Sequence, residues 1–198
     1  MNRIVPAILV FIFSMPGCAS NSYEEKEDWF FQLATPLHYD VWVEHVELEL
    51  SGVRHWYHPA GTMNCCWRGP NGPKGITGRL EPFPNFIALQ WFSLSERKYY
   101  QRLISVKPEW KNRMRELAPV QTANGVRHEP RRFLVFGLAP GGEIVVWIKG
   151  QIGNEVELAR LQANQIQGDP QDYAALLQTY RDKHGEYLKE NGIPLSGW

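Results

Sequence analysis

Residues 86–106 read FIALQWFSLSERKYYQRLISV, and this stretch decides the fold class. Its two halves, 86–94 and 97–106, are rich in aromatic and branched side chains, and only Ser95 and Glu96 separate them. Aromatic and β-branched residues favour strands, and so short a connection is typical of two antiparallel neighbours. The stretch therefore predicts a β-hairpin.

Three further regions predict strands. Segments 132–138 and 143–149 flank Ala139-Pro140-Gly141-Gly142, in which proline presets one turn residue and glycine allows a positive φ, so they form a second hairpin. Between residues 41 and 50, apolar residues alternate with Glu47 and Glu49, a period of two that places one face inside and one in water. Residues 156–161 fit a strand or a helix, and we favour the strand.

Two segments predict helices and two predict loops. Residues 108–117 start with proline and contain no β-branched side chain, which indicates a short basic helix. Apolar residues keep helical spacing from 173 to 188, after Asp169-Pro170 and before Asn191-Gly192, which are typical helix start and stop signals. The Gly/Pro-dense stretch 67–84 and the polar stretch 118–130 indicate loops.

These elements together predict a mainly β fold of the α+β class. We expect an antiparallel sandwich-like or curved sheet built from hairpins, with one C-terminal helix packed on it. The chain has 198 residues, of which 43% are hydrophobic and 13% aromatic, so it suits one domain with a dense core, placed at residues 29–198.

The N-terminus has the pattern of an export signal. Arg3 precedes an apolar run at 4–13, which is too short to span a bilayer. Ser14-Met15-Pro16-Gly17 followed by Cys18 resembles the lipobox of bacterial lipoproteins. The resemblance implies a signal peptide at 1–17, lipidation of Cys18, a tether over 18–28, and anchoring at the periplasmic face of the outer membrane, because no Asp follows the cysteine.

Charge is balanced overall but unevenly distributed. The 21 basic and 21 acidic side chains cancel, which argues against nucleic-acid binding. Residues 24–50 nevertheless carry eight acidic side chains and one basic one, whereas residues 97–115 carry seven basic and one acidic. Such blocks are either solvated faces or a complementary surface for a protein partner.

Cysteine and histidine side chains do not predict a metal or cofactor site. The cluster 55–58, with His at each end, precedes Cys65-Cys66, but a zinc site usually needs two separated ligand pairs. With Cys18 lipidated, Cys65 and Cys66 are the remaining thiols in an oxidising compartment. They form either a disulfide between neighbours or a buried pair of free thiols.

Four segments resemble one family of bacterial lipoproteins. They are Pro84–Ser93 with Glu96 and Lys98-Tyr99-Tyr100, then Gly137–Glu143 with Val146-Trp147, then Gly192-Ile193-Pro194 with Trp198, together with the lipobox. This pattern is similar to the lipoproteins grouped as domain of unknown function 2931. Some members of this and neighbouring families look like immunity proteins encoded beside type VI secretion effectors such as phospholipases.

We therefore expect a binding protein and not an enzyme. Nucleophile-elbow, Walker, His-Glu-x-x-His and Rossmann motifs are missing from the sequence, and Glu96 and Glu143 read as solvated hairpin charges. The hypothesis is that the protein neutralises an antibacterial toxin, encoded by a neighbouring gene, by occluding its active site. The alternative is an envelope-maintenance lipoprotein that binds lipid, peptidoglycan or an assembly machine. Candidate partner contacts are Trp67, Arg68, Lys74, Arg79, Arg97, Arg113 and Arg115.

Overall fold

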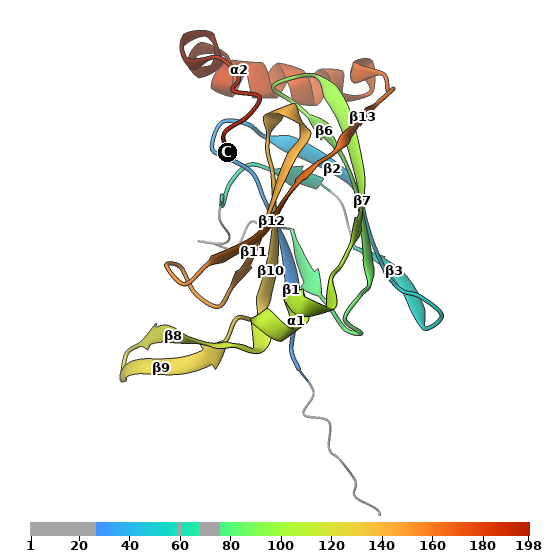
Figure 1. Ribbon diagram of the computed structural model, residues 1–198. Coiled ribbons are helices and arrows are strands. Elements are labelled where there is room, and N and C mark those ends of the chain that lie inside the picture. The colour runs from blue at the N-terminus through green and yellow to red at the C-terminus, as the bar shows by residue number, and fades with distance from the viewer. Residues whose placement is uncertain (1–26, 59–60, 68–75) are drawn as a thin grey trace, which may run out of the picture.

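The computed structural model describes residues 27–58, 61–67 and 76–198. Two β-sheets pack face to face, with a helix across one end (Figure 1). The first sheet has the strand order β13-β7-β6-β2-β3, with β4 also pairing with β2, and the second has the order β12-β11-β10-β1-β5. The fold is mainly β with one C-terminal helix, as predicted.

The six-stranded sheet contains the hairpin that the sequence predicted. Its strands are β2 (Val41–Leu50), β3 (Arg54–His58), β4 (Gly61–Met63), β6 (Phe86–Ser93), β7 (Lys98–Ser105) and β13 (Asn164–Ile166). Strands β6 and β7 pair antiparallel from Phe86 opposite Ser105 to Ser93 opposite Lys98. Arg97 has a φ of 57° in the turn between them.

The five-stranded sheet contains the second predicted hairpin. Its strands are β1 (Phe30–Ala34), β5 (Thr77–Arg79), β10 (Phe133–Leu138), β11 (Glu143–Lys149) and β12 (Val156–Gln162). Strands β10 and β11 are joined by a 3₁₀ turn at Pro140–Gly142, and β1 pairs parallel with β10. The chain passes from β12 into β13, which pairs in the other sheet, so one edge of the sandwich is continuous.

Side chains from both sheets form one central core. Phe31 and Leu33 of β1 and Phe136 of β10 meet Leu89 and Trp91 of β6, all essentially without solvent exposure. Alternation along each strand directs these side chains inward and their neighbours outward. This core explains why the chain forms two layers.

Helix α2 (Ala174–Asn191) covers the upper part of the outer face of the six-stranded sheet. Leu177 and Tyr180 pack against Phe92 and Tyr99 in a second apolar cluster. Asp169 accepts a hydrogen bond from the backbone N–H of Gln171, and Gly192 ends the helix with a φ of 71°, as the sequence predicted.

The prediction of a loop at 118–130 is wrong. Strands β8 (Leu117–Thr122) and β9 (Gly125–Pro130) form an antiparallel hairpin that extends from the body beside the short helix α1 (Pro108–Arg115) (Figure 1). Most of its side chains are exposed, so its strands carry no apolar alternation for a sequence pattern to reveal. Asn124-Gly125 at its tip was the available signal.

The expected loop at 67–84 contains β5, which adds to the edge of the sheet by pairing with β1. A Cβ atom at Gly78 would lie 2.2 Å from the ring of His58 and 2.5 Å from that of Phe31. The glycine is therefore required by close packing inside a strand, although its residue type indicates a loop.

His58 makes folding stability depend on pH. Burial lowers the pKa of this imidazole below its ordinary value of 6.5, and its Nε2 atom is buried without a hydrogen-bond partner. Between the lowered pKa and 6.5 the unfolded chain binds more protons than the folded one, so stability falls as the pH falls through this window.

We expect the His58→Gln variant to lose less stability than the parent protein between about pH 7.5 and about pH 5.5. Urea unfolding at both pH values measures the difference, and the other titrating groups are common to both proteins. An equal loss in the two proteins would contradict the prediction.

An open face on the six-stranded sheet as the candidate binding site

The outward side chains of the six-stranded sheet form rows that run across the strands. Trp42, Phe92, Tyr99 and Ile166 form the row that lies under helix α2. The rows beyond it are not covered by the helix. We call these uncovered rows the open face, and its residues are His45, Glu47, Glu49, His55, Tyr57, Phe86, Ala88, Gln90, Gln101, Leu103 and Asn164.

The open face is hollowed around Ala88. A depression of about 430 Å³ is lined by side chains of β2, β6, β7 and β13, and a smaller one of about 80 Å³ adjoins it. Both share Glu47, Ala88 and Leu103, which stand opposite one another on three neighbouring strands. The small alanine between two longer side chains accounts for the depression.

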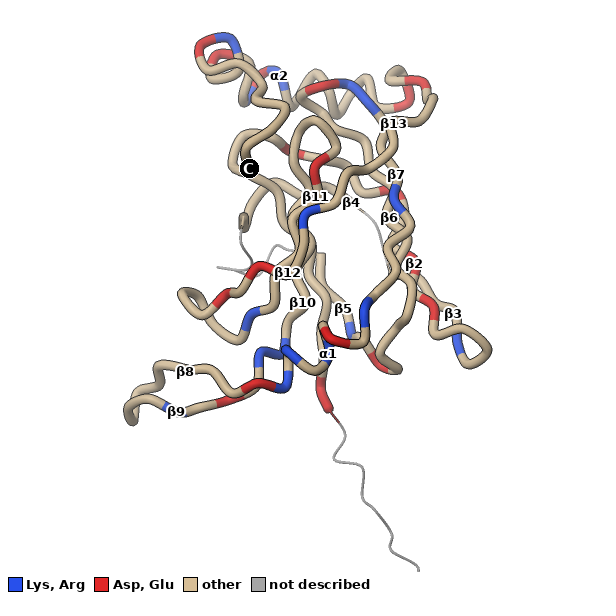
Figure 2. The backbone as a smooth tube through the Cα atoms, in the orientation of Figure 1, with Lys and Arg blue, Asp and Glu red and all other residues tan. Residues whose placement is uncertain are grey.

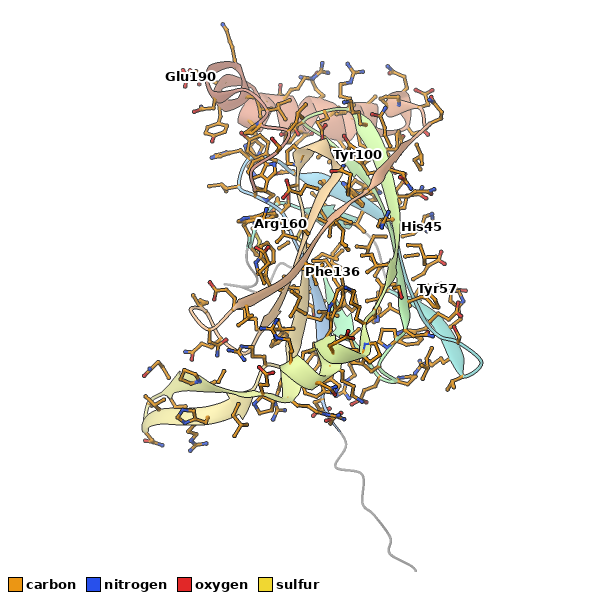
Figure 3. The ribbon with its side chains drawn as sticks, in the orientation of Figure 1. His45, Tyr57, Tyr100, Phe136, Arg160 and Glu190 are labelled. Atoms are coloured by element: carbon orange, nitrogen blue, oxygen red, sulfur yellow. A yellow bond between two sulfur atoms is a disulfide. The ribbon has the colours of Figure 1, made fainter. Side chains whose placement is uncertain are left out.

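Two large apolar side chains are exposed on this face: Leu103 lines the hollow, and Tyr57 lies beyond Glu47 in the same row. Leu103 of β7 is 62% exposed and Tyr57 of β3 is 72% exposed. Both belong to the row that runs through Glu47 and Ala88. In Figure 3, Tyr57 and His45 lie on the side of the sheet that faces away from the core residue Phe136. Exposed apolar groups around a hollow are typical of an interaction surface.

The carboxylates of the open face belong to β2, and the Arg102 side chain of β7 also lines the hollow. Glu47 lies 3.4 Å from His55 Nε2, and Glu49 accepts a hydrogen bond from the Ser51 hydroxyl. Glu44 borders the face and accepts hydrogen bonds from Gln90 and from the Tyr173 hydroxyl of the segment that leads into α2, both at 2.5 Å. Burial and the adjacent Glu44 raise the pKa of Tyr173. In Figure 2 the acidic residues, drawn in red, accordingly lie along β2.

The acidic block of the sequence thus contributes a stripe to one face, but the basic block does not form a single surface. Arg97 lies in the β6–β7 turn at the α2 end, whereas Arg113 and Arg115 belong to α1 at the opposite end (Figures 1 and 2). Arg79 is on β5, where its guanidinium lies 3.3 Å from the carboxylate of Asp28. Among the described candidate arginines, Arg79, Arg113 and Arg115 thus lie at the α1 end, where Asp28 and the adjacent Glu27 pair with Arg79 and Arg115, and Arg97 is apart from them.

Trp67 lies on the outer face of the five-stranded sheet. Its ring packs edge-on against Trp147 and Trp198, with centroids 5.0 and 6.0 Å apart. A Cβ atom at Gly137 would come within 2.6 Å of both the Trp67 and the Trp147 rings. Trp67 is therefore packed on the sheet and remote from the open face. The candidate residues Arg68 and Lys74, and the predicted lipidation site Cys18, lie outside the described residues.

The remaining polar candidates have structural contacts. Cys65 and Cys66 are joined by a disulfide bond. Within residues 27–58, 61–67 and 76–198, no three His, Cys, Asp or Glu side chains are grouped to hold a metal ion. The expectation of a solvated Glu96 is wrong: its side chain is 3% exposed and accepts hydrogen bonds from Tyr100 of β7 and from the Gly141 backbone N–H in the β10–β11 turn. Glu143 pairs with Arg160 at 2.6 Å.

Sequence reasoning missed the residues that shape the open face. Leu103, Ala88 and Tyr57 lie in strands, and the available signal was the period-two pattern of 86–94 and 97–106, which assigns Ala88, Gln90, Gln101 and Leu103 to one side. Which rows stay uncovered depends on where α2 packs. The alternation of residues along a strand does not predict the position of that helix.

The structure is a two-sheet α+β domain. Helix α2 covers one half of the outer face of its larger sheet, and the other half is the open face. The chain belongs to the family described as "Protein of unknown function (DUF2931)", whose model matches residues 18–196. The family resemblance inferred from the hairpin motifs is confirmed. No curated protein and no solved structure matches the chain. Among the described residues, no helix is long and apolar enough to cross a membrane.

Proposed function

We propose that this protein is a lipid-anchored periplasmic lipoprotein, not an enzyme, that binds and neutralises a secreted antibacterial effector by covering the entrance to its active site. The observation that carries the proposal is the open face. Leu103 lines a hollow that a protruding side chain of a partner can fill, and Tyr57 exposes a second apolar group in the same row.

The charge of the face defines the partner surface that fits it. Glu47 and Glu49 stand on the exposed side of β2 next to the hollow, so a partner with basic side chains around an apolar anchor is complementary. A basic surface is also a suitable property for an effector that acts on phospholipids, whose headgroups are anionic. We therefore propose a phospholipase-like effector as the partner.

The test is co-expression of the protein in the periplasm with the product of the neighbouring gene. We expect the parent protein to protect the cells and the Leu103→Glu variant to bind the effector about 100-fold more weakly and to protect poorly, because the substitution puts a charge at a central apolar contact. Binding is measured with the purified proteins.

The Ile152→Glu variant is the matched control, since Ile152 is an exposed aliphatic residue in the turn between β11 and β12. It should bind and protect like the parent. If Leu103→Glu binds as well as the control, the open face is not the binding surface. If the parent does not protect, the immunity function is wrong.

A second candidate function rests on the tryptophan cluster. Trp67, Trp147 and Trp198 line a hollow of about 270 Å³ together with Glu155, Glu157 and Arg160. Indole rings beside carboxylates are suited to a sugar ring with its hydroxyl groups, as an envelope-maintenance protein that binds peptidoglycan needs. Titration of the tryptophan fluorescence with soluble peptidoglycan fragments tests it, and an unchanged spectrum would reject it.

A further inference from the structure

The described chain begins at the end of the sandwich opposite α2, where it is fixed to α1 (Figure 1). The Glu27 carboxylate accepts hydrogen bonds from the Arg115 guanidinium and from Trp29 Nε1, and lies 3.1 Å from Lys111 Nζ. The Arg115 guanidinium beside it is the main reason that the pKa of Glu27 falls to about 2. The segment at 27–29 therefore enters the fold at one defined place.

The β8–β9 hairpin starts at the same place and exposes an apolar face. Its register puts the apolar residues Leu117, Pro119, Val126 and Pro130 on one side of the two strands, together with Gln121 and His128. Leu117 is 65% exposed and Val126 53% exposed. Leu117 and Pro130 also line a hollow of about 350 Å³ together with Glu27 and Trp29, so this apolar side adjoins the point where the chain enters.

Cationic side chains surround this apolar face. Residues 107–132 contain seven Lys or Arg and three Glu. Lys107, Arg113 and Arg132 are exposed, and none of them has an ion pair with another residue of the described chain, whereas Arg127 is on the opposite side of the hairpin. Exposed cations beside exposed apolar groups are the combination that binds the surface of an anionic bilayer.

Chain length brings this end close to a membrane if Cys18 carries the lipid, a condition that rests on the proposed function. Glu27 follows Cys18 by nine positions, and an extended chain of that length spans at most about 30 Å. The α1 end is then the part of the domain nearest to the bilayer, and α2 is farthest from it.

We propose that α1 and the β8–β9 hairpin form a membrane-contact foot that lies on anionic phospholipid headgroups. Leu117 and Val126 enter the headgroup region, and Lys107, Arg113 and Arg132 bind lipid phosphates. Each exposed Lys or Arg near such a surface strengthens the binding by its attraction to the anionic headgroups. The open face is on the side of the sandwich, so it stays accessible to a partner while the foot rests on the bilayer.

The test uses the mature chain with Cys18→Ser, so that no acyl chain contributes, and measures co-sedimentation with vesicles. We expect binding to vesicles that contain phosphatidylglycerol, weaker binding to pure phosphatidylcholine vesicles, and a fall in binding with added salt. The Leu117→Asp/Val126→Asp double variant and the Arg113→Glu/Arg132→Glu double variant should each bind at least about tenfold more weakly.

The matched controls are Val53→Asp, in the exposed turn after β2, and Arg181→Glu, on α2. They should bind vesicles like the parent, and circular dichroism checks that all variants are folded. Equal binding by foot and control variants, or no preference for anionic vesicles, would overturn the proposal. So would a dimer that forms without lipid and is lost in Leu117→Asp/Val126→Asp, because the apolar face would then bind a second copy.

This experiment is independent of the proposed function. Mass spectrometry of the membrane-extracted full-length protein shows whether Cys18 carries acyl chains, and co-expression shows whether an effector is neutralised. Vesicle binding by the unlipidated chain can succeed when either of those fails, and it can fail when both succeed.

Discussion

Replacing Trp91 with alanine is expected to lower the free energy of unfolding by about 3–5 kcal/mol. The Trp91 side chain of β6 has no solvent exposure and lies in the core between the two sheets. It stacks on Tyr100 of β7 with ring centroids 5.5 Å apart. Truncation removes the largest fully buried side chain and leaves a cavity that rigid strands cannot close, and urea unfolding measures the loss.

The control for this prediction is Trp91→Phe. The indole Nε1 atom of Trp91 is buried and has no hydrogen-bond partner, so phenylalanine keeps most of the ring and removes an unpaired polar group. We expect Trp91→Phe to retain well over half of the stability that Trp91→Ala loses. Equal losses for the two variants would show that the indole as a whole, and not the volume of an aromatic ring, is needed.

The Glu96→Ala variant should lose about 1–3 kcal/mol of stability. Glu96 is in the β6–β7 turn, and its carboxylate accepts hydrogen bonds from the Tyr100 hydroxyl at 2.8 Å and from the Gly141 backbone N–H at 3.1 Å. It therefore connects the turns of the two predicted hairpins, one in each sheet. Alanine leaves both donors inside the protein without an acceptor, which is the costly way to lose a hydrogen bond.

Tyr100→Phe separates the two bonds of Glu96. It removes one donor while the bond to Gly141 remains, so its loss should be smaller than that of Glu96→Ala. The double variant tests coupling, because residues in one hydrogen-bond network are not additive. If Glu96→Ala unfolds at the same urea concentration as the parent, the carboxylate does not join the sheets. Trp91 should stay unchanged in this series, since it touches Tyr100.

The proposed foot and the open face together define an orientation of the domain relative to the bilayer. Glu27 and the hairpin are at one end, and α2 covers the half of the sheet at the other end. If both proposals hold, the acidic face stands beside the bilayer and can meet a basic effector before it reaches the lipid. The vesicle and co-expression experiments test these two surfaces with different variants.

Local patterns in the sequence were enough for the elements with a buried face. The alternation at 41–50, the short connection at 95–96 and the turn at 139–142 each involve neighbouring residues, and all three predictions hold in the structure. The start and end of the C-terminal helix were equally predictable, because Asp169 and Gly192 act on backbone groups within one turn. These features depend on contacts over a few residues.

Local sequence patterns gave wrong predictions where backbone pairing or contacts between distant residues determine the structure. The β8–β9 hairpin has no buried face, and β5 contains Gly78 because His58 and Phe31 occupy the space beside it. The buried position of Glu96 depends on Gly141, which is 45 residues away in the other sheet. No local pattern contains such information.

The fold class, the family and the two hairpins were predictable from the residues alone, since strand propensity, turn chemistry and period-two burial are properties of short segments. Which part of the sheet stays open depends on long-range packing, because α2 packs over the row of Phe92 and not over the row of Ala88. The tertiary structure also places Arg97 and Arg115 at opposite ends of the molecule, since β7 runs the length of the sheet between them.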